Sequence, residues 1–318
     1  MDKIKDNKIQ KALKKTYKKI KKINKGENAS YIPELAKVDP KIYGISICTC
    51  DGTIYNIGDF KKEVAIESVA KVFTLVLALE KVGAKTLKEK IGNHGSFLPF
   101  NSVIAAEISE SHTLNSFVNA GAMATTSLLY EPSKIHFWKL IENNMNTFAG
   151  RNLKLSQRIY NSESKTNHHN KALSYLLKSY NRFYGDVEST TDVYTKQGSV
   201  LVNSQDISIM ASTFANDGIN PVTGKKAISK KNIRYVLGQM VGGGLYEYSD
   251  TWFTEIGIPA KSGVGGVIMC VVPGIMGIGI VSPPLNKSGN SVKGIETSKM
   301  LSKLLNLSIL TKPSQYFK

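Results

Sequence analysis

Cysteine is scarce in this sequence, with three residues among 318: Cys48, Cys50 and Cys270. So few thiols cannot form a disulfide framework, and their odd number indicates a reducing compartment. Their spacing lacks the ligand pattern of a zinc site, and the glycine run 242–244 lacks the Gly-Lys-Ser/Thr ending of a phosphate-binding loop. We therefore expect a cytoplasmic protein that holds no metal ion and no cofactor.

Arginine is also scarce, because only four of the 42 basic residues are arginines and the other 38 are lysines. The formal net charge of +17 is concentrated in residues 1–25, which carry eleven lysines against two aspartates. Proteins that read nucleic acids favour arginine for bidentate contacts to bases and phosphates. A lysine-rich excess is more typical of a soluble surface, so we do not expect nucleic acid as a partner.

A long uninterrupted apolar run is missing as well. The N-terminal residues lack the apolar core of a secretory signal. The run from Val264 to Leu285 is broken by a Pro-Gly pair at 273–274 and ends in Ser-Pro-Pro at 282–284. These interruptions favour two short buried strands joined by a turn over a membrane-spanning helix. We expect no membrane segment.

Within residues 1–25, apolar side chains recur every three to five positions between the lysines. They predict a basic amphipathic N-terminal helix ahead of a main domain over residues 26–318. The helix either packs its apolar stripe on that domain, which we favour, or binds a membrane surface or a partner. The apolar positions are Ile4, Ile9, Leu13, Tyr17, Ile20 and Ile23.

Strand patterns occupy both ends of the main domain, and helical patterns its middle. Strands over 43–50 and 54–57 flank Asp51-Gly52, a strong hairpin signal, and strand-like runs fill 252–282. The sequence predicts an α/β fold with a mainly antiparallel sheet that is built from both chain ends and flanked by helices. A helical second lobe, about residues 80–240, is inserted in it. Helical periodicity covers 68–81, 134–149, 171–180, 204–216 and 290–305.

The first chemical motif is Ser68-Val69-Ala70-Lys71, at the start of a predicted helix. A serine and a lysine three positions apart lie on one helix face, so the amine can reach the hydroxyl. The helix N-terminus supplies positive potential where an oxyanion would form. This is the Ser-x-x-Lys arrangement of serine acyl-transfer enzymes, although a solvated pair on a surface helix gives the same pattern.

The second motif is Lys261-Ser262-Gly263, inside a strand-like run. A Lys-Ser/Thr-Gly strand facing a Ser-x-x-Lys helix is a feature of the penicillin-recognising fold. Two buried lysines in one pocket lower each other's pKa, and desolvation lowers both, so one of them can act as a neutral base. The order of the two motifs and the gap between them suit a β-lactamase/DD-peptidase-like fold.

Further blocks, in the same order along the chain, are similar to the serine-dependent glutaminases. This family has the β-lactamase-like fold and hydrolyses L-glutamine to L-glutamate and ammonia. The resemblance covers residues 31–295 and implies the same reaction here, through a glutamyl-enzyme intermediate. The similar blocks are Tyr31–Ala36, Val118–Ala122, Pro259–Val264, Ser282–Leu285 and Gly289–Gly294.

By this resemblance Ser68 is the nucleophile, Lys71 its base, and Tyr246 a tyrosine that helps to move protons. The backbone N–H groups of Ser68 and Val264 would form the oxyanion hole, supported by the 261–263 motif. Because free glutamine carries an ammonium and a carboxylate, the carboxylate expected to bind the ammonium is that of Glu163. The resemblance also implies a homodimer or homotetramer. The glutamine-contacting positions match Tyr31, Asn119, Glu163, Asn170 and Tyr194.

The chain departs from the family pattern at several places. Glu67 stands where glutamine is usual, Gly198 where cysteine is frequent, and His169 where arginine is common. Residues 93–102 lack the usual Glu-Pro-Ser-Gly block. If Glu67 turns toward Lys71, it favours the charged amine and weakens the base.

Two other interpretations stay open at the level of sequence. The same fold could serve a β-lactamase or a penicillin-binding enzyme, which needs an open groove for a peptide. Alternatively, the chain is a catalytically weak scaffold that binds a partner through its basic N-terminal segment, with an affinity that falls as salt rises.

Overall fold

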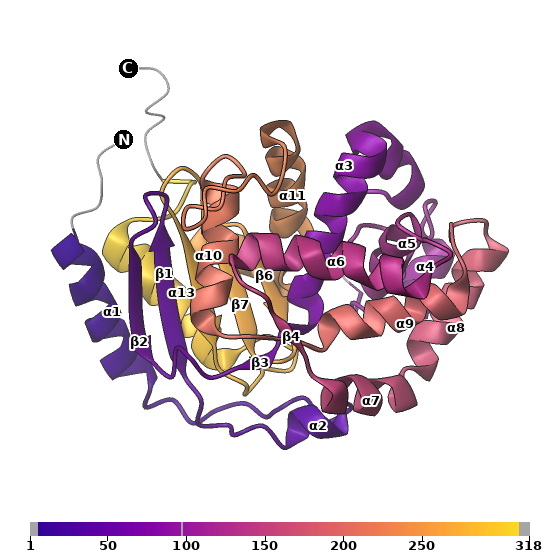
Figure 1. The fold of residues 1–318 in the computed structure, drawn as a ribbon. Helices are drawn as coiled ribbons and strands as arrows, with labels where there is room; N and C mark the ends of the chain where they lie inside the picture. The colour runs from indigo at the N-terminus through magenta and orange to yellow at the C-terminus, as the bar shows by residue number, and fades with distance from the viewer. Residues whose placement is uncertain (1–5, 97, 312–318) are drawn as a thin grey trace.

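A computed structural model describes residues 6–96 and 98–311 of the chain. Two lobes lie side by side in Figure 1: a sheet lobe from both ends of the chain and a helical lobe from its middle. Within these residues, every helix is too short or too polar to traverse a lipid bilayer.

The sheet lobe contains a five-stranded antiparallel sheet with the strand order β2-β1-β8-β7-β6. β1 and β2 form the hairpin predicted around Asp51-Gly52, and β7 and β8 are the two buried strands predicted on either side of 273–274. Strand β1 also pairs with β8, so both chain ends build one sheet, as predicted. The bounds are β1 Gly44–Thr49, β2 Ile54–Gly58, β6 Ala260–Gly263, β7 Val267–Val272 and β8 Met276–Val281.

One face of this sheet is covered by α10 (Ser204–Ala215), which lies across β8 and β1 (Figure 1). The helix approaches closely because β8 has glycines on this face: a Cβ added to Gly277 would lie 2.2 Å from the backbone nitrogen of Ser212. A capping box between Asn203 and Asp206 fixes the start of the helix. Helix α10 therefore packs on the sheet, although its residues fall within 80–240.

The opposite face is covered by α1 (Asp6–Ile20), α12 (Ser249–Ile256) and α13 (Val292–Leu305). Helix α1 buries Ile9, Leu13 and Ile20, and its lysines face solvent. The expected packing of this amphipathic helix on the domain is confirmed for these residues. Ile4 lies outside the described residues.

The helical lobe is arranged around α3 (Ala70–Ile91). The helices expected over 134–149 and 171–180 correspond to α6 and α8. The ring of Phe73 lies 5.0 Å from that of Phe148, which lies 4.9 Å from Phe214 of α10, so one apolar core joins the two lobes. The other helices are α2 Pro33–Ala36, α4 Val103–Ile108, α5 Asn119–Ser127, α6 Lys134–Ala149, α7 Gln157–Thr166, α8 His168–Ser179, α9 Val187–Gly198 and α11 Lys230–Gly243.

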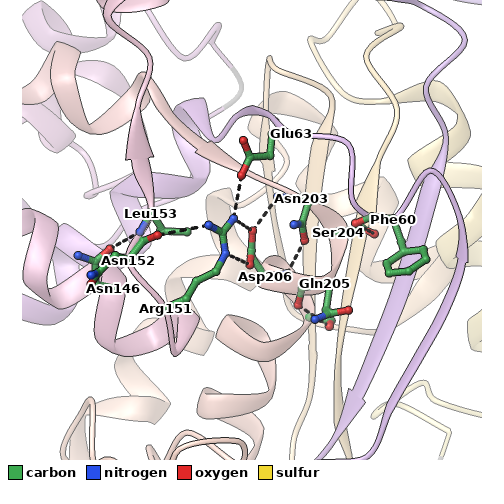
Figure 2. A network of polar contacts seen from close by, with 11 residues as sticks. Phe60, Glu63, Asn146, Arg151, Asn152, Leu153, Asn203, Ser204, Gln205 and Asp206 are labelled. Atoms are coloured by element: carbon green, nitrogen blue, oxygen red, sulfur yellow. Dashed lines mark hydrogen bonds and ion pairs between the residues drawn. The ribbon is translucent and has the colours of Figure 1, made fainter.

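A small second sheet, β3-β5-β4, lies at the junction of the lobes, with β3 Val64–Ala65, β4 Lys154–Leu155 and β5 Val200–Val202. Figure 2 shows the ion-pair network beside it. The Arg151 guanidinium donates to both carboxylate oxygens of Asp206, at 2.7 and 2.6 Å, and to Glu63 at 3.1 Å. Asp206 is buried, so this bidentate pair ties α10 to the segment just before β4, and the contact with Glu63 adds the segment just before β3.

Two predictions were wrong in detail. The strand-like run expected from residue 252 begins instead with α12, where Trp252 is buried and donates its indole N–H to Ile258 O at 2.7 Å. The helix expected over 68–81 starts later and runs further: the 3₁₀ turn η1 (Glu67–Val69) precedes α3, which kinks at Gly83 and continues to Ile91.

Candidate active site

The turn that carries Ser68 follows β3 and leads into α3. Ile66 donates its N–H to Val200 O at 2.9 Å, which extends the pairing of β3 with β5 up to this turn. Glu67 then has a φ of 49°, in the left-handed region that non-glycine residues rarely occupy. Ser68 is half-buried at the N-terminus of α3, where the helix dipole favours negative charge.

Lys71 lies one turn further along and is buried beneath the serine turn. Its Nζ donates to Phe117 O at 3.1 Å and to Asn119 Oδ1 at 2.6 Å. Burial lowers the pKa of Lys71 to about 7, and the carboxyls of Glu67 and Glu163 oppose that shift. A lysine with this pKa is a neutral amine in a large fraction of molecules near neutral pH, so it can accept a proton.

Asn119, the first residue of α5, links Lys71 to the far wall of the site. Its Oδ1 accepts hydrogen bonds from Lys71 and, at 3.3 Å, from the hydroxyl of Tyr194. Its Nδ2 donates to Asn170 Oδ1 at 3.0 Å. One amide thus holds the lysine, α8 and α9 in fixed relation to each other.

Strand β6 closes the site on the side of the sheet lobe. A Cβ on Gly263 would lie 2.5 Å from Ile66 O, so glycine allows this strand to lie against the serine turn. The Lys261 side chain is fully buried and donates to Gly244 O at 3.1 Å and Ser262 O at 2.6 Å. Burial lowers the pKa of Lys261, and the positive charge of Lys71 lowers it further. The second motif therefore lies against the first, as the fold prediction required.

Tyr246 lies in the 3₁₀ turn η2 (Tyr246–Tyr248), also with a left-handed φ, 59°. Its hydroxyl donates to Ser262 O at 3.1 Å, and the Lys261 Nζ lies 4.5 Å from its ring centroid. Burial raises the pKa of Tyr246, and the neighbouring Ser68 hydroxyl partly offsets that rise. The structure thus places a neutral phenol beside the serine.

A pocket of about 140 Å³ opens at Ser68. This volume suits a single amino acid better than a peptide. Lys71 contacts the wall through its hydrogen bond to Asn119, and Tyr246 packs against Phe100 of the wall, with ring centroids 4.6 Å apart. Burial raises the pKa of Glu163 to about 8, and Lys71 opposes that rise. The predicted residues in the wall are Tyr31, Ser68, Asn119, Glu163, Asn170, Tyr194 and Val264.

Sequence reasoning did not assign every residue of the wall to the site. Glu67 and His169 were noted only as departures from a family pattern, yet both face the pocket. His169 Nε2 lies 2.6 Å from Asn101 O, which joins α8 to the loop before α4. Thr166 and Asn167 could have been found, because they lie between Glu163 and Asn170 in one segment. The wall residues without an assigned role were Ile32, Glu67, Phe100, Asn101, Thr166, Asn167 and His169.

The arrangement has the parts of a serine acyl-transfer site. It combines a half-buried hydroxyl at a helix N-terminus, a buried lysine of lowered pKa and a phenol beside the hydroxyl. In the described part of the chain, no three histidine, cysteine or carboxylate side chains gather closely enough to hold a metal ion.

Comparison with known proteins gives one consistent family. The family model described as glutaminase matches residues 26–310. A glutaminase of Colwellia psychrerythraea is 43% identical over 301 residues, which are 95% of this chain and 97% of the relative. Glutaminase 1 of Escherichia coli K12 is 42% identical over 303 residues, which are 95% of this chain and 98% of that protein.

Solved structures agree with these relatives. The structure of a protein described as probable glutaminase YbaS superposes with a TM-score of 0.95 at 41% identity, covering 97% of this chain and 100% of that one. A probable glutaminase from Bacillus subtilis, complexed with 6-diazo-5-oxo-L-norleucine, gives a TM-score of 0.83 at 27% identity, covering 97% and 98% of the two chains. The predicted fold, the β-lactamase-like fold of the glutaminases, is the fold of this chain.

Proposed function

The chain belongs to the glutaminase family, hydrolases that act on the amide of glutamine, and we propose that Ser68, Lys71 and Tyr246 carry out this reaction. The observation that supports this assignment most is their placement at one small pocket. Ser68 lines the pocket, Lys71 with a pKa of about 7 donates a hydrogen bond to Asn119 of its wall, and Tyr246 lies beside the serine and packs against Phe100 of the wall.

In the first half of the reaction, Ser68 Oγ attacks the side-chain carbonyl carbon of glutamine, and Lys71 accepts the hydroxyl proton. The backbone N–H groups of Ser68 and Val264 stabilise the oxyanion. The C–N bond then breaks, and the proton is returned to the leaving nitrogen by way of the Tyr246 hydroxyl, so ammonia leaves. In the second half, water attacks the glutamyl ester, glutamate is released and Ser68 recovers its proton.

Substrate selection follows from the charges of free glutamine. Glu163 binds the α-ammonium, because it is a buried carboxyl in the pocket wall. Tyr31, Asn119, Asn170 and Tyr194 supply the neutral hydrogen-bonding groups for the α-carboxylate and the side-chain amide. A pocket of about 140 Å³ favours this single amino acid over a peptide or a penicillin.

The cell compartment and the assembly are part of the same proposal. Cys48, Cys50 and Cys270 are all free thiols, which supports a cytoplasmic location.

On α4, Ile104 and Ile108 are 63% and 74% exposed, and a second copy of the chain in a homodimer or homotetramer would cover such side chains. Light scattering on wild type and Ile108→Glu tests this, because the wild type should be the larger particle.

The function is tested by glutamate release from L-glutamine with wild type and Ser68→Ala, with and without phosphate. We expect turnover by the wild type and near-total loss in Ser68→Ala. The diazoketone 6-diazo-5-oxo-L-norleucine should attach covalently to Ser68, which peptide mass spectrometry detects and which Ser68→Ala should abolish. Labelling by a fluorescent penicillin with no glutamine turnover would instead support the penicillin-binding alternative. No turnover, with salt-sensitive binding of a partner to residues 1–25, would support the scaffold.

A further inference from the structure

Two buried carboxyl groups share one side of the pocket. Glu67, from the serine turn, and Glu163, from α7, are only 7% and 9% exposed. Both reach the same point of α9: a Cβ added to Gly198 would lie 3.6 Å from Glu67 Oε2 and 3.7 Å from Glu163 Oε2. Glu67 Oε1 and Glu163 Oε2 are buried without a hydrogen-bond partner. The two groups thus lie close together in a place that does not solvate two negative charges.

The positive charges nearby do not compensate two carboxylates. Lys71 directs its Nζ to Phe117 O and Asn119 Oδ1. Lys261 directs its Nζ to Gly244 O and Ser262 O. The other titratable groups that face Glu67 are the phenols of Tyr31, Tyr194 and Tyr246, whose pKa values are raised by burial and further by Glu67. They remain neutral and add no positive charge.

We propose that Glu67 and Glu163 share one proton when glutamine is bound, that Glu67 carries it, and that neutral Glu67 is a substrate-binding residue. The proposal rests on the proposed function, since it assumes that glutamine occupies this pocket. The positive charge of the α-ammonium then lowers the pKa of Glu163 from about 8, so Glu163 ionises and binds the ammonium while Glu67 keeps the proton. Glu67, as a carboxylic acid, donates a hydrogen bond to an oxygen of the substrate, as an amide N–H would.

The electrostatics agree with this division of roles. Burial raises the pKa of Glu67 well above its ordinary value, the neighbouring Glu163 raises it further, and Lys71 opposes the rise. The pKa of Glu163 is raised by burial to about 8, and Lys71 opposes the rise. Two close carboxyls rarely ionise together in a dry site, as acid dyads in other enzymes illustrate.

Ionisation of Glu67 would harm the reaction in two ways. A second carboxylate repels the α-carboxylate of glutamine, so KM rises. It also stabilises the charged form of Lys71, so less free amine is available to activate Ser68. We therefore expect kcat/KM to rise with pH as Lys71 loses its proton and to fall again as the carboxyl pair loses its own.

The test is the pH profile of kcat/KM for L-glutamine in wild type, Glu67→Gln and the control Glu247→Gln. Glu247 is a solvent-exposed carboxyl next to Tyr246, so Glu247→Gln makes the same side-chain substitution outside the pair. Wild type and the control should lose about tenfold per pH unit above the pKa of the pair. Glu67→Gln should lose less than about twofold over the same range, because its amide donates at every pH. An unchanged alkaline fall in Glu67→Gln overturns the proposal, and so does a folded but inactive Glu67→Gln.

A second measurement does not depend on turnover. Infrared difference spectra across pH 6 to 10 should show, in the wild type, the C=O stretch of a buried carboxylic acid that persists after Glu163, with its pKa of about 8, has ionised. That band should be absent from Glu67→Gln. Its absence from the wild type overturns the shared proton. Since Ser68→Ala tests the glutaminase reaction itself, failure of the proposed function and failure of this inference give different results.

Discussion

Asn119 is the single side chain on which Lys71, Tyr194 and Asn170 converge, through hydrogen bonds of 2.6, 3.3 and 3.0 Å. A neutral oxygen at Oδ1 stabilises the position of Lys71 without favouring its charged form as strongly as a carboxylate would. The amide is therefore suited to holding a lysine that, in the proposed reaction, loses its proton.

The variant Asn119→Asp tests whether the neutral amide keeps the pKa of Lys71 low. A carboxylate at the same place favours the ammonium form, so the pKa of Lys71 rises above about 7 and the acidic limb of kcat moves to higher pH. We expect kcat at pH 7 to fall roughly tenfold for each unit of that rise. Asn161→Asp, exposed on α7, is the matched control and should leave the limb in place. An acidic limb that stays where the wild type has it would contradict this role of Asn119.

At the scale of elements, the closest approach of α10 to β8 depends on glycine. Replacement of Gly277 by alanine puts a Cβ 2.2 Å from the Ser212 nitrogen, which belongs to backbone and cannot rotate away. We expect Gly277→Ala to lower the free energy of unfolding by about 1–3 kcal/mol, the cost of overpacking. Gly238→Ala, in α11 with no atom within 4 Å of the new Cβ, should raise it by up to about 1 kcal/mol. Urea unfolding of the two variants would contradict the argument if both changed in the same direction.

At the scale of the whole molecule, the buried carboxyl Glu163 makes stability depend on pH. Its pKa is about 8 in the folded chain and close to its ordinary value, 4.5, when unfolded. Between these values the folded chain holds a proton that the unfolded chain has released, so this carboxyl destabilises the fold progressively as pH rises. Glu163→Gln should therefore gain stability relative to wild type between pH 5 and 8. Urea unfolding of the wild type and Glu163→Gln at several pH values measures this difference. A difference that stays constant with pH would rule out the raised pKa.

The parts of the fold that were predictable are those set by local pattern. The hairpin at Asp51-Gly52 and α6 over 134–149 follow from turn residues and periodicity alone. Trp252 was misplaced because an aromatic residue beside apolar neighbours is compatible with a strand or a short helix. Its burial against Ile258 is tertiary information.

The active site likewise has a part that the sequence predicts and a part that only the tertiary structure reveals. Ser68 and Lys71 form a local motif, and the family resemblance supplied half of the pocket wall, while the other wall residues had no assigned role. The sequence could not reveal that Glu67 and Glu163 both face Gly198, because the three lie on different elements. Glu67 and Gly198 each depart from the family pattern, and only the packing of α9 against the serine turn shows that they are neighbours.

The pairing of β1 with β8 has a consequence for how this chain is made. Gly44 lies opposite Val281, so a central strand of the sheet has no partner on that side until nearly the whole polypeptide has been synthesised. During translation, at about 5–20 residues per second, the early hairpin must wait for many seconds with one edge exposed. The serine turn and the Lys-Ser-Gly strand β6 likewise come together only at that last step. A nascent glutaminase that stalls before β8 emerges is therefore inactive and a natural client for a chaperone that covers strand edges.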